Sequence, residues 1–550
     1  MFLVISALFS CFASCNDENN GDGDTNISDN SNYAIVYSEN ASANIVKAVC
    51  ALRDRVKART NIELAVKDDI DEAPMEILIG DTDRDATASV KAKLDGVNNK
   101  SAFVIEAVGN KIVILGKSDD VTVHAIKYFA TSFISDAGKD SAITIDPNHS
   151  SVHKADTDMI VFPENLVGLK FSDKISVYSH DDKFSAQSLY YPTAIQLRYQ
   201  ENAENNGKML ATLNSSEQFY RILESKDGTD WKQIATVYDR VNSLCRGGRM
   251  PMLYELPADM GQYKKGTVLL AGTSSALNTS SQEKSAIVVY YSTDLGKTWT
   301  SGQNVDFGEG RTDGEGVWEP CLIYEESTGR IYCFYSDDSD PAHDQKIVYK
   351  YTSDLVTWTG SDGNGADSAP FDAVASADSK LRPGMVSLTK MDNGEYIMVY
   401  EVGHARYKDS TATVYYKKSK SLGDWGDVSY VGDVVLTTDK HAFGSAPWCT
   451  YTSVAGENGM FITTGRYRDD RNSDPSEPDL FISFDFAESF THIENPFDYT
   501  NTDLHLGKFG YSPFFLTSSD GKTIYYFNTS LFKPVNKTQC IEMVRIEIIE

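Results

Sequence analysis

Two glutamates stand where strands rich in aromatic residues begin and end. Glu319 lies between Trp318 and Pro320 at the start of one apolar run, and Glu401 follows Tyr400 at the end of another. A buried carboxylate is costly unless it has partners or takes part in chemistry. Two carboxylates, one charged and one protonated at the working pH, are what glycoside hydrolysis requires. The plain alternative is a structural salt bridge, for which three arginines are available: Arg382, Arg406 and Arg466.

Both carboxylates need rigid strands to hold them. Residues 316–324 and 331–336 are apolar and aromatic, and Ser327-Thr328-Gly329 lies between them, which predicts a β-hairpin that carries Glu319. Residues 395–401 follow the turn residues Asn393-Gly394 and predict a second strand of this kind, which carries Glu401. We therefore expect two strand-borne carboxylates that a larger scaffold brings together.

A repeated turn motif indicates what that scaffold is. Beyond residue 154 the chain shows only short strands and turns, and a Ser-Asp turn that closes on an aromatic residue recurs every 59 to 68 residues. Regular turns among strands are typical of a radial repeat, whose usual closed form is a β-propeller. The roughly 370 residues after position 180 hold between five and six such repeats, so we expect six blades. The closing aromatic residues are Trp231, Trp299, Trp358, Trp425 and Phe490.

The turn motif resembles the Asp-box of sialidase-like propellers, which is structural and carries no chemistry. We expect residues 154–550 to form the propeller and the strand near 542–549 to close the ring by pairing with early propeller sequence. Closure removes exposed sheet edges, which otherwise invite aggregation.

Residues 32–153 predict a separate, smaller domain. Strand patterns at 33–37, 76–80, 102–105 and 111–116 alternate with helical spacing around 45–56 and 121–129. This order predicts a small α+β sandwich with helices covering one face of a sheet. The segment 77–84, the Gly109-Asn110 turn and the final helix resemble the noncatalytic N-terminal domain of bacterial hexosaminidase- and glucuronidase-type enzymes.

The motifs around the two glutamates resemble those of glycoside hydrolase family 93. They are Trp318-Glu319-Pro320 followed by a hairpin, Arg382-Pro383-Gly384-Met385, and the run 393–401. The resemblance implies an exo-acting, retaining α-1,5-L-arabinanase on a six-bladed propeller, with Glu319 and Glu401 as its catalytic pair. A retaining pair should have carboxyl groups ~5–5.5 Å apart. The resemblance leaves the two roles open, and of the two assignments we expect Glu319 as nucleophile and Glu401 as acid/base.

Further side chains complete the predicted site, because aromatic faces stack on sugars and arginines orient carboxylates. These substrate-binding candidates are Trp318, Arg382, Tyr400, Trp448, Arg466 and Tyr511. A sialidase is the first alternative, although Tyr191-Pro192-Thr193-Ala194 stands where sialidases carry an arginine-containing motif. A noncatalytic glycan-binding propeller at the cell surface is the second.

The composition of the chain limits the kinds of molecule that it is expected to bind. The 550 residues carry a net charge of -28, which argues against binding nucleic acid or anionic membranes. No cysteine falls in a CxxC pair and no ligand set has convincing spacing, so we expect neither a metal nor another cofactor. The expected partner is a polysaccharide or oligosaccharide. Cys321 and Cys333, on the two arms of the hairpin, are either a disulfide or two buried thiols.

The first 15 residues resemble a bacterial signal peptide with a lipobox. The apolar run is too short to span a bilayer, and small residues precede Cys15, which we expect to be lipidated. Residues 16–31 are nearly all Asn, Asp, Gly and Ser and predict a flexible linker. We expect a lipoprotein of the bacterial cell surface or periplasm, held to the membrane by its lipid alone, or otherwise a secreted protein.

Overall fold

The computed structural model describes residues 33–134, 143, 145–179, 189–215, 219–241, 247–275, 284–309, 316–407, 410–468, 479–497, 511–533 and 538–550. The expected signal peptide, the lipidation site at Cys15 and the linker lie outside these residues. Among the described helices, none combines the length and the apolar character that a bilayer crossing requires. The chain divides into two compact units, residues 1–170 with 548–550, and residues 171–547.

The first unit contains a six-stranded mixed sheet in the order β2-β1-β3-β5-β4-β6. Strands β2, β1, β3 and β5 run parallel to one another, whereas β4 pairs antiparallel with both β5 and β6. Its elements are β1 (Tyr33–Tyr37), α2 (Ala43–Thr60), β2 (Ala65–Asp68), β3 (Met75–Ile79), α3 (Asp85–Asp95), β4 (Ala102–Val108), β5 (Lys111–Gly116), α4 (Asp119–Ser132) and β6 (Ser150–Lys154), followed by the hairpin β7 (Met159–Phe162) and β8 (Val167–Phe171).

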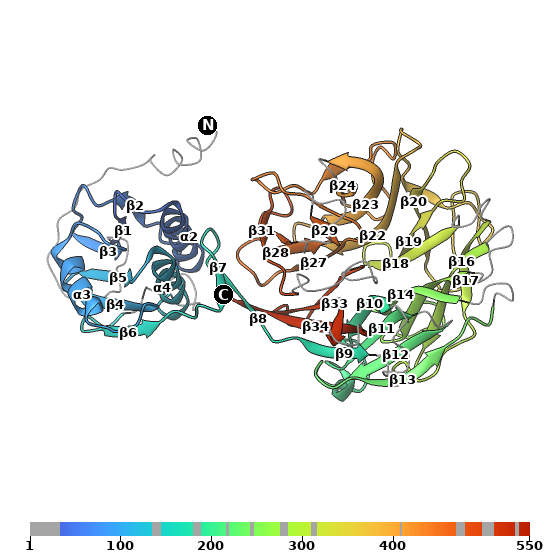
Figure 1. Ribbon diagram of the computed structural model, residues 1–550, viewed down its shortest axis with the longest axis horizontal. Helices are drawn as coiled ribbons and strands as arrows, with labels where there is room; N and C mark the ends of the chain where they lie inside the picture. The colour runs from blue at the N-terminus through green and yellow to red at the C-terminus, as the bar shows by residue number, and fades with distance from the viewer. Residues whose placement is uncertain are drawn as a thin grey trace. The chain divides into compact units, whose positions relative to one another are not determined.

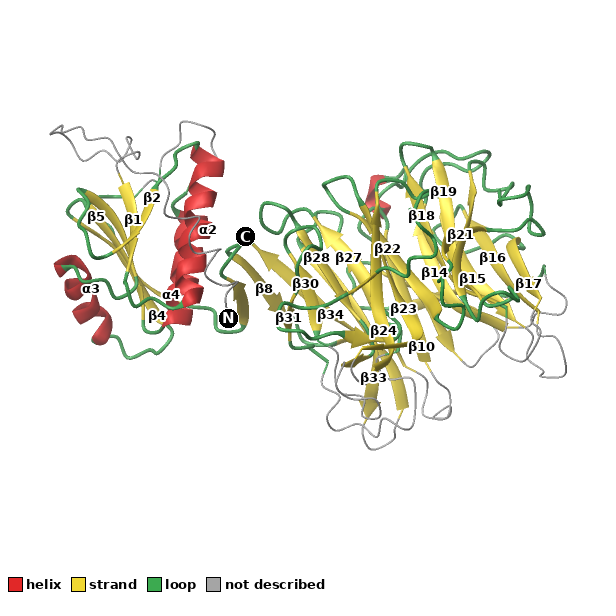
Figure 2. Cartoon of the chain, turned by 90° about the horizontal axis from the view of Figure 1, so that it is seen from above, coloured by secondary structure: helices red, strands yellow, loops and turns green. Residues whose placement is uncertain are grey.

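Helices cover both faces of this sheet (Figure 2). Helices α2 and α4 pack on one face together with Ile35, whereas Val90 and Leu94 of α3 pack on the other face together with Val36. The expectation that helices cover one face is therefore wrong. Side chains on both faces of β1 are apolar, so both faces of the sheet must be packed against other apolar residues.

The second unit is a β-propeller whose described residues form six blades around a common centre (Figure 1). In each blade the innermost strand is followed outward by antiparallel neighbours, as the repeat in the sequence predicts. The first three blades are β10 (Leu189–Gln196), β11 (Met209–Ser215), β12 (Tyr220–Ser225) and β13 (Lys232–Val237), with a 3-10 turn at Ala203–Asn205; β14 (Gly247–Glu255), β15 (Val268–Ser275), β16 (Lys284–Ser292) and β17 (Gln303–Glu309); and β18 (Val317–Glu325), β19 (Arg330–Asp337), β20 (Lys346–Thr352) and β21 (Phe371–Val374).

The remaining blades differ in their outer strands. The fourth is β22 (Arg382–Lys390), β23 (Tyr396–Tyr407), β24 (Ser410–Ser419) and β25 (Asp433–Val434), extended by β26 (Phe443–Gly444) and β29 (Tyr467–Arg468). The fifth is β27 (Trp448–Thr452), β28 (Met460–Thr464), β30 (Leu480–Ser483) and β31 (Thr491–Ile493), and the sixth begins with β32 (Phe514–Thr517), β33 (Thr523–Lys533) and β34 (Thr538–Ile549).

The sixth blade closes the ring with both ends of the propeller sequence. Its β34 pairs antiparallel with β9 (Ile175–Ser179), and Ile541 lies opposite Tyr178. The expected pairing of the C-terminal strand with early propeller sequence is confirmed. Strand β33 occupies the other edge of β34, so this strand is held on both sides.

The repeated Ser-Asp turns pin the outer strands. In the second blade the Asp294 carboxylate accepts from the backbone N–H of Thr298 at 2.9 Å, and the Ser292 hydroxyl accepts from Gly296 N–H at 2.9 Å. The indole N–H of Trp299 donates to the Gly296 carbonyl at 2.8 Å. These bonds fix a tight turn between β16 and β17 without pointing a side chain at the propeller centre.

Cys321 and Cys333 are separate buried thiols. In the β18–β19 register Cys333 lies opposite Leu322, so the two cysteines are diagonal neighbours. Burial raises the pKa of the Cys321 thiol to about 12, which keeps it protonated and unreactive.

Candidate active site

Glu319 lies at a β-bulge in the innermost strand of the third blade. The β18–β19 register breaks between Trp318 and Cys321, and Glu319 adopts a left-handed φ of 64°. A bulge leaves a residue unpaired and turns its side chain away from the regular alternation. Such a backbone costs about 1–3 kcal/mol for a residue other than glycine, and this kind of strain clusters at functional sites.

The same irregularity recurs in every blade of the propeller. Strands β10, β14 and β22 break register at equivalent places, and in the other two blades the left-handed residue stands two positions before β27 and β32. Five of the six left-handed residues precede a proline. With their φ angles these residues are Tyr191 (51°), Met250 (51°), Glu319 (64°), Met385 (54°), Ala446 (49°) and Ser512 (60°).

Residues at or next to these six positions converge at the centre of the propeller. One cavity is lined by side chains from the innermost strand of every blade, including Tyr191, Met250, Glu319, Met385 and Ser512. Five of the six left-handed residues thus line one cavity, and the sixth, Ala446, directly precedes Pro447, which also lines it. They identify the central funnel as the place where residues distant in sequence meet.

Glu319 is held by neutral donors from three blades. Its Oε1 accepts a hydrogen bond from the Tyr191 hydroxyl at 2.7 Å. Its Oε2 accepts from the Ser336 hydroxyl at 2.8 Å and from the Met385 backbone N–H at 3.1 Å. The Glu319 backbone N–H in turn donates to Thr273 Oγ1 at 3.1 Å. These bonds fix the carboxyl group in one orientation.

Glu401 reaches the same region from the second strand of the fourth blade. In the β22–β23 register it lies opposite Gly384, next to the Met385 that contacts Glu319. Its Oε2 accepts from the backbone N–H of Ala446 at 2.7 Å, and the Ser445 side chain is a further donor.

Unequal electrostatics distinguish the two carboxyl groups. Burial and then the charge of Glu401 raise the pKa of Glu319 to about 7. Burial also raises the pKa of Glu401, but Ala446, Ser445 and the positive charges of Arg382 and Arg466 oppose that rise. Burial thus favours one shared proton on the pair, and the two arginines favour a charge on Glu401.

Two tyrosines border the carboxyl pair. The rings of Tyr191 and Tyr511 meet edge to face with centroids 5.4 Å apart, and their hydroxyl oxygens lie 3.5 Å apart. The Arg466 guanidinium lies over the Tyr511 ring, 5.0 Å from its centroid. Burial, followed by the charges of both glutamates, raises the pKa of Tyr511 far above its ordinary value. Tyr511 is therefore a neutral hydroxyl and a weak nucleophile.

Arg382 and Trp318 share one acidic anchor. Arg382 Nη2 lies 3.2 Å from Asp338 Oδ2, and the Trp318 indole N–H donates to Asp338 Oδ1 at 3.0 Å. Arg382 also donates to Gln345 Oε1 at 2.6 Å and to the Asp344 carbonyl at 2.8 Å. Both predicted binding residues are thus fixed in place next to the bulge.

Five of the six predicted binding residues gather around the pair or its cavity, and the sixth does not. Trp448 lines the cavity and packs against Phe514, with ring centroids 4.7 Å apart and ring planes inclined by 46°. Tyr400 is completely buried between blades, and its hydroxyl donates to the Val431 carbonyl at 2.6 Å. The prediction that Tyr400 binds substrate is wrong, because no face of its ring is accessible to a sugar.

Several contributors were not predicted from the sequence. Tyr191, Ser336 and Met385 hold Glu319, Asp338 orients two binding residues, and Ser445 with Ala446 holds Glu401. The residue-proline step at the head of five innermost strands is a signal that identifies two of them, Tyr191 and Ala446. The other donors carry no such signal, because their role depends on the bulge geometry.

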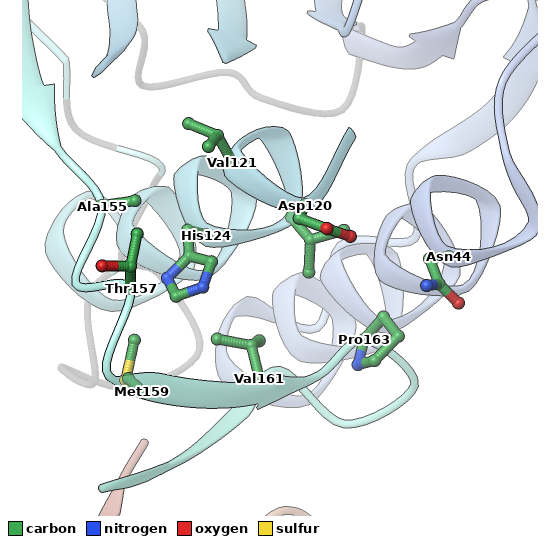
Figure 3. A pocket seen from close by; sticks show the side chains of 10 residues that line it. Asn44, Asp120, Val121, His124, Ala155, Thr157, Met159, Val161 and Pro163 are labelled. Carbon is green, nitrogen blue, oxygen red and sulfur yellow. The ribbon is translucent and has the colours of Figure 1, made fainter. Parts of the chain in front are cut away.

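The first unit has a cavity of its own, about 380 Å³ in volume, lined by residues of α2, α4 and β7 and by Thr157 (Figure 3). His124 projects into it beside Thr157, and Asn44 lies at the opposite end. Burial lowers the pKa of His124, so its imidazole is neutral at pH 7. None of the predicted site residues lines this cavity.

Solved structures resemble the propeller. The alpha-L-arabinanase of Penicillium chrysogenum complexed with arabinobiose is 26% identical, with a TM-score of 0.55, and the match covers 69% of this chain and 98% of that chain. The GH93 alpha-L-arabinofuranosidase of Fusarium graminearum with arabinobiose is 24% identical, with a TM-score of 0.55 and coverage of 68% and 98%. Neither protein-family models nor curated proteins match the sequence. The six-bladed fold and the resemblance to the family-93 structures are confirmed.

Proposed function

We propose that this glycoside hydrolase cleaves α-1,5-linked L-arabinan or a related plant polysaccharide from the chain end, with retention of configuration. The observation that carries hydrolysis is the pair Glu319 and Glu401, partly buried near the propeller centre with unequal electrostatic partners. The substrate class is supported by the resemblance to an arabinanase complexed with arabinobiose. The exo mode is supported by the motifs around both glutamates.

In this proposal Glu319 is the acid/base and Glu401 the nucleophile. Two arginines favour a charge on Glu401, and burial beside that charge favours a proton on Glu319. These contacts support roles opposite to those expected from the sequence.

The reaction then proceeds in two balanced steps. Glu319 donates its proton to the glycosidic oxygen while a Glu401 oxygen attacks the anomeric carbon, so the leaving sugar departs as an alcohol and a glycosyl ester forms on Glu401. Glu319, now ionised, removes a proton from water, and that water breaks the ester. The product keeps its anomeric configuration and both carboxyl groups return to their starting states. No step needs a metal.

Product analysis of the full chain tests the proposal. Linear arabinan, branched arabinan, arabinoxylan and sialyllactose are each incubated with the enzyme, and the products are separated over time. We expect one small arabinose-containing product to accumulate from the first time point on linear arabinan, and NMR to detect the retained anomer first.

Three outcomes would overturn parts of this proposal. Release of sialic acid alone points to a sialidase, and binding to arabinan without any product points to a glycan-binding propeller. Early release of oligosaccharides of many sizes rules out the exo mode. Glu319→Gln and Glu401→Gln are the matched controls, since any activity that both variants keep comes from elsewhere.

A further inference from the structure

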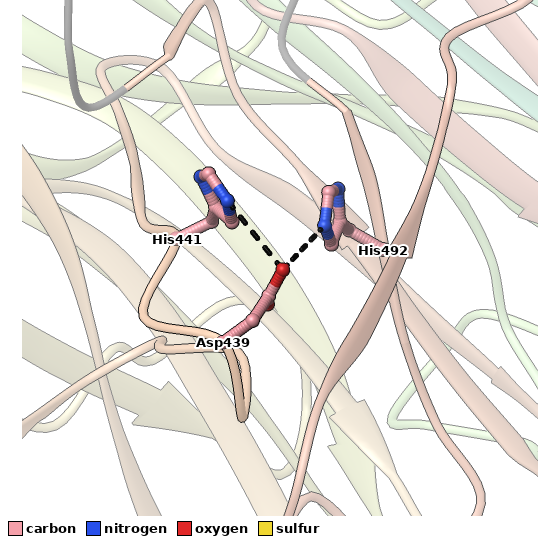
Figure 4. Close-up of side chains that lie close together, drawn as sticks. All are labelled: Asp439, His441 and His492. Atoms are coloured by element: carbon pink, nitrogen blue, oxygen red, sulfur yellow. Dashed lines mark hydrogen bonds and ion pairs between the residues drawn. The ribbon is translucent and has the colours of Figure 1, made fainter.

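Three side chains that can ligate a metal converge on the outer part of the propeller (Figure 4). Asp439 and His441 lie on the loop between β25 and β26, and His492 lies on β31 of the next blade. His492 Nε2 is 3.2 Å and His441 Nε2 is 3.5 Å from the same atom, Asp439 Oδ2. Their ligand atoms all lie within 4.8 Å of one another.

Hydrogen bonds within the loop at residues 437–441 hold Asp439 and His441 in position. The backbone N–H of Thr437 donates to the His441 carbonyl and that of Lys440 to the Thr437 carbonyl, both at 2.9 Å, and Lys440 adopts a φ of 70°. The Thr437 hydroxyl donates to Asp439 Oδ1 at 2.6 Å. One carboxylate oxygen is thus engaged within the loop, and the other faces both imidazoles.

An outer carboxylate orients His492. Its Nδ1 lies 2.6 Å from Oδ2 of Asp479, a residue that is 9% exposed. An N–H at Nδ1 leaves the lone pair on Nε2, the atom that faces Asp439. Histidines that bind metals usually donate their second N–H to a carboxylate in this way, which fixes the ring and raises its basicity.

We propose that Asp439, His441 and His492 bind a divalent transition metal, with Zn²⁺ as the preferred ion. Zinc takes imidazole nitrogen and carboxylate oxygen at ~2.0–2.2 Å in a tetrahedral arrangement, which places ligand atoms ~3.4 Å apart. The two oxygen–nitrogen separations of 3.2 Å and 3.5 Å match that spacing. Two imidazoles exclude Ca²⁺ and Mg²⁺, which take oxygen ligands, and water completes the fourth position.

The site lies between two blades and is structural in character. It connects the loop after β25 in the fourth blade to the outer strand of the fifth blade. His441 stands two residues before β26, which leads to Ser445 and Ala446. Bound metal therefore stabilises the loop that leads to Ser445 and Ala446, the two residues that hold Glu401. It takes no part in the two-carboxylate reaction. The spacing of the sequence does not predict this cluster, because His492 joins it only through the blade packing.

Metal binding is measured on the full chain, without a polyhistidine tag, after treatment with a chelator. Titration calorimetry with Zn²⁺ alone should give one site, and Co²⁺ should give the visible absorption of a four-coordinate ion. Zn²⁺ should raise the melting temperature by several degrees. His441→Ala and His492→Ala should each weaken Zn²⁺ binding by at least ~100-fold, and Asp479→Asn, which removes no ligand, by ~10–100-fold.

The control variant is His404→Ala, which removes an exposed histidine from another part of the fourth blade and should bind Zn²⁺ as the wild type does. Circular dichroism without metal establishes that each variant folds, and Asp439→Asn provides a ligand change of equal size. Zn²⁺ binding that survives His492→Ala, or a wild-type chain that shows no saturable binding, would overturn the site. Hydrolysis of arabinan by the chelated enzyme is a separate readout and decides nothing about the site.

Discussion

Glu319 combines a strained backbone with a carboxyl group that burial and a neighbouring charge keep protonated near neutral pH. Both features reduce the stability of the folded chain. Both are explained if Glu319 must donate a proton to one position in the bound substrate. Glu401 is the complementary residue, with two arginines and a backbone amide around it. The proposed reaction therefore depends on the different electrostatic surroundings of the two carboxyl groups.

Substitution of either glutamate by glutamine should leave the fold intact and reduce kcat/KM by at least ~10³-fold, because each removes a role played only in the transition state. An aryl arabinofuranoside with a good leaving group separates the roles. That substrate needs little protonation, so Glu319→Gln should keep much of its first-step rate, whereas Glu401→Gln should not. A reversed pattern, measured by burst kinetics, would assign the roles the other way round.

The pH profile of kcat/KM should be bell-shaped. Activity should fall above about pH 7, where Glu319 loses the proton it must donate. It should also fall on the acid side, through the raised pKa of Glu401, because the nucleophile must be ionised. The alkaline limb should be missing from the residual activity of Glu319→Gln. An optimum at pH 9 would contradict these assignments.

Stability should fall as pH rises from about 4.5 to 7. Glu319 has a folded-state pKa of about 7 and an unfolded value near 4.5, so over that interval ionisation favours the unfolded chain. The full loss is about 3 kcal/mol at 1.36 kcal/mol per pKa unit. Glu319→Gln should lack this component and exceed the wild type in urea midpoint at pH 8, though not at pH 4. Equal midpoints at pH 8 would show that the carboxyl group is not buried as described.

Motif and strand spacing identify both glutamates, but they do not identify their partners. Tyr400 was expected at the site because it is aromatic and adjacent to Glu401. Alternation along a strand places adjacent residues on opposite faces, so a funnel-facing Glu401 requires an interior Tyr400. The hydroxyl donors Tyr191 and Ser336 come from other strands, and only the folded chain brings them to Glu319.

At the scale of elements, the Ser-Asp turns are the part of the fold that sequence specifies most directly. Their bonds are local, between residues two to four apart, so a motif is sufficient to predict them. Helix α3 and its cover of the second sheet face were not predicted, because Val90 and Leu94 have helical spacing but form too short a pattern to define a helix by themselves.

Asp294→Ala should therefore lower the stability of the propeller by about 1–2 kcal/mol, since it removes an acceptor of charge-assisted hydrogen bonds. It should leave kcat unchanged, because Asp294 lies between the outer strands β16 and β17. Urea unfolding and initial rates measure the two effects. Lys297→Ala, an exposed change in the same turn, is the matched control and should alter neither. A large loss of kcat in Asp294→Ala would contradict a purely structural turn.

At the scale of the whole molecule, the ring closes through a single strand pairing between distant parts of the chain. Ile541 in β34 lies between Thr529 of β33 and Tyr178 of β9. Closure was predictable from the repeat, since an open propeller leaves two sheet edges exposed. The bulges within the innermost strands were not, because the register breaks appear only once the strands are paired.

Ile541→Pro should prevent closure, because proline cannot donate to the sheet and the strand is paired on both sides. We expect a large drop in melting temperature and a tendency to aggregate, measured by light scattering. Lys232→Pro is the control, since Lys232 is the first residue of β13, an outermost strand, where proline is tolerated. Equal stability of the two variants would show that the β9–β34 pairing does not hold the ring.

The six left-handed positions have a consequence for redesign. Tyrosine, methionine, glutamate, alanine and serine all occupy them with φ between 49° and 64°, so the backbone geometry there does not depend on the side chain that it carries. Each blade therefore carries one position beside the same central cavity at which different side chains are accepted. A combinatorial library restricted to these positions, with Glu319 and its hydroxyl donor Tyr191 kept, would therefore sample new substrate preferences on the same scaffold.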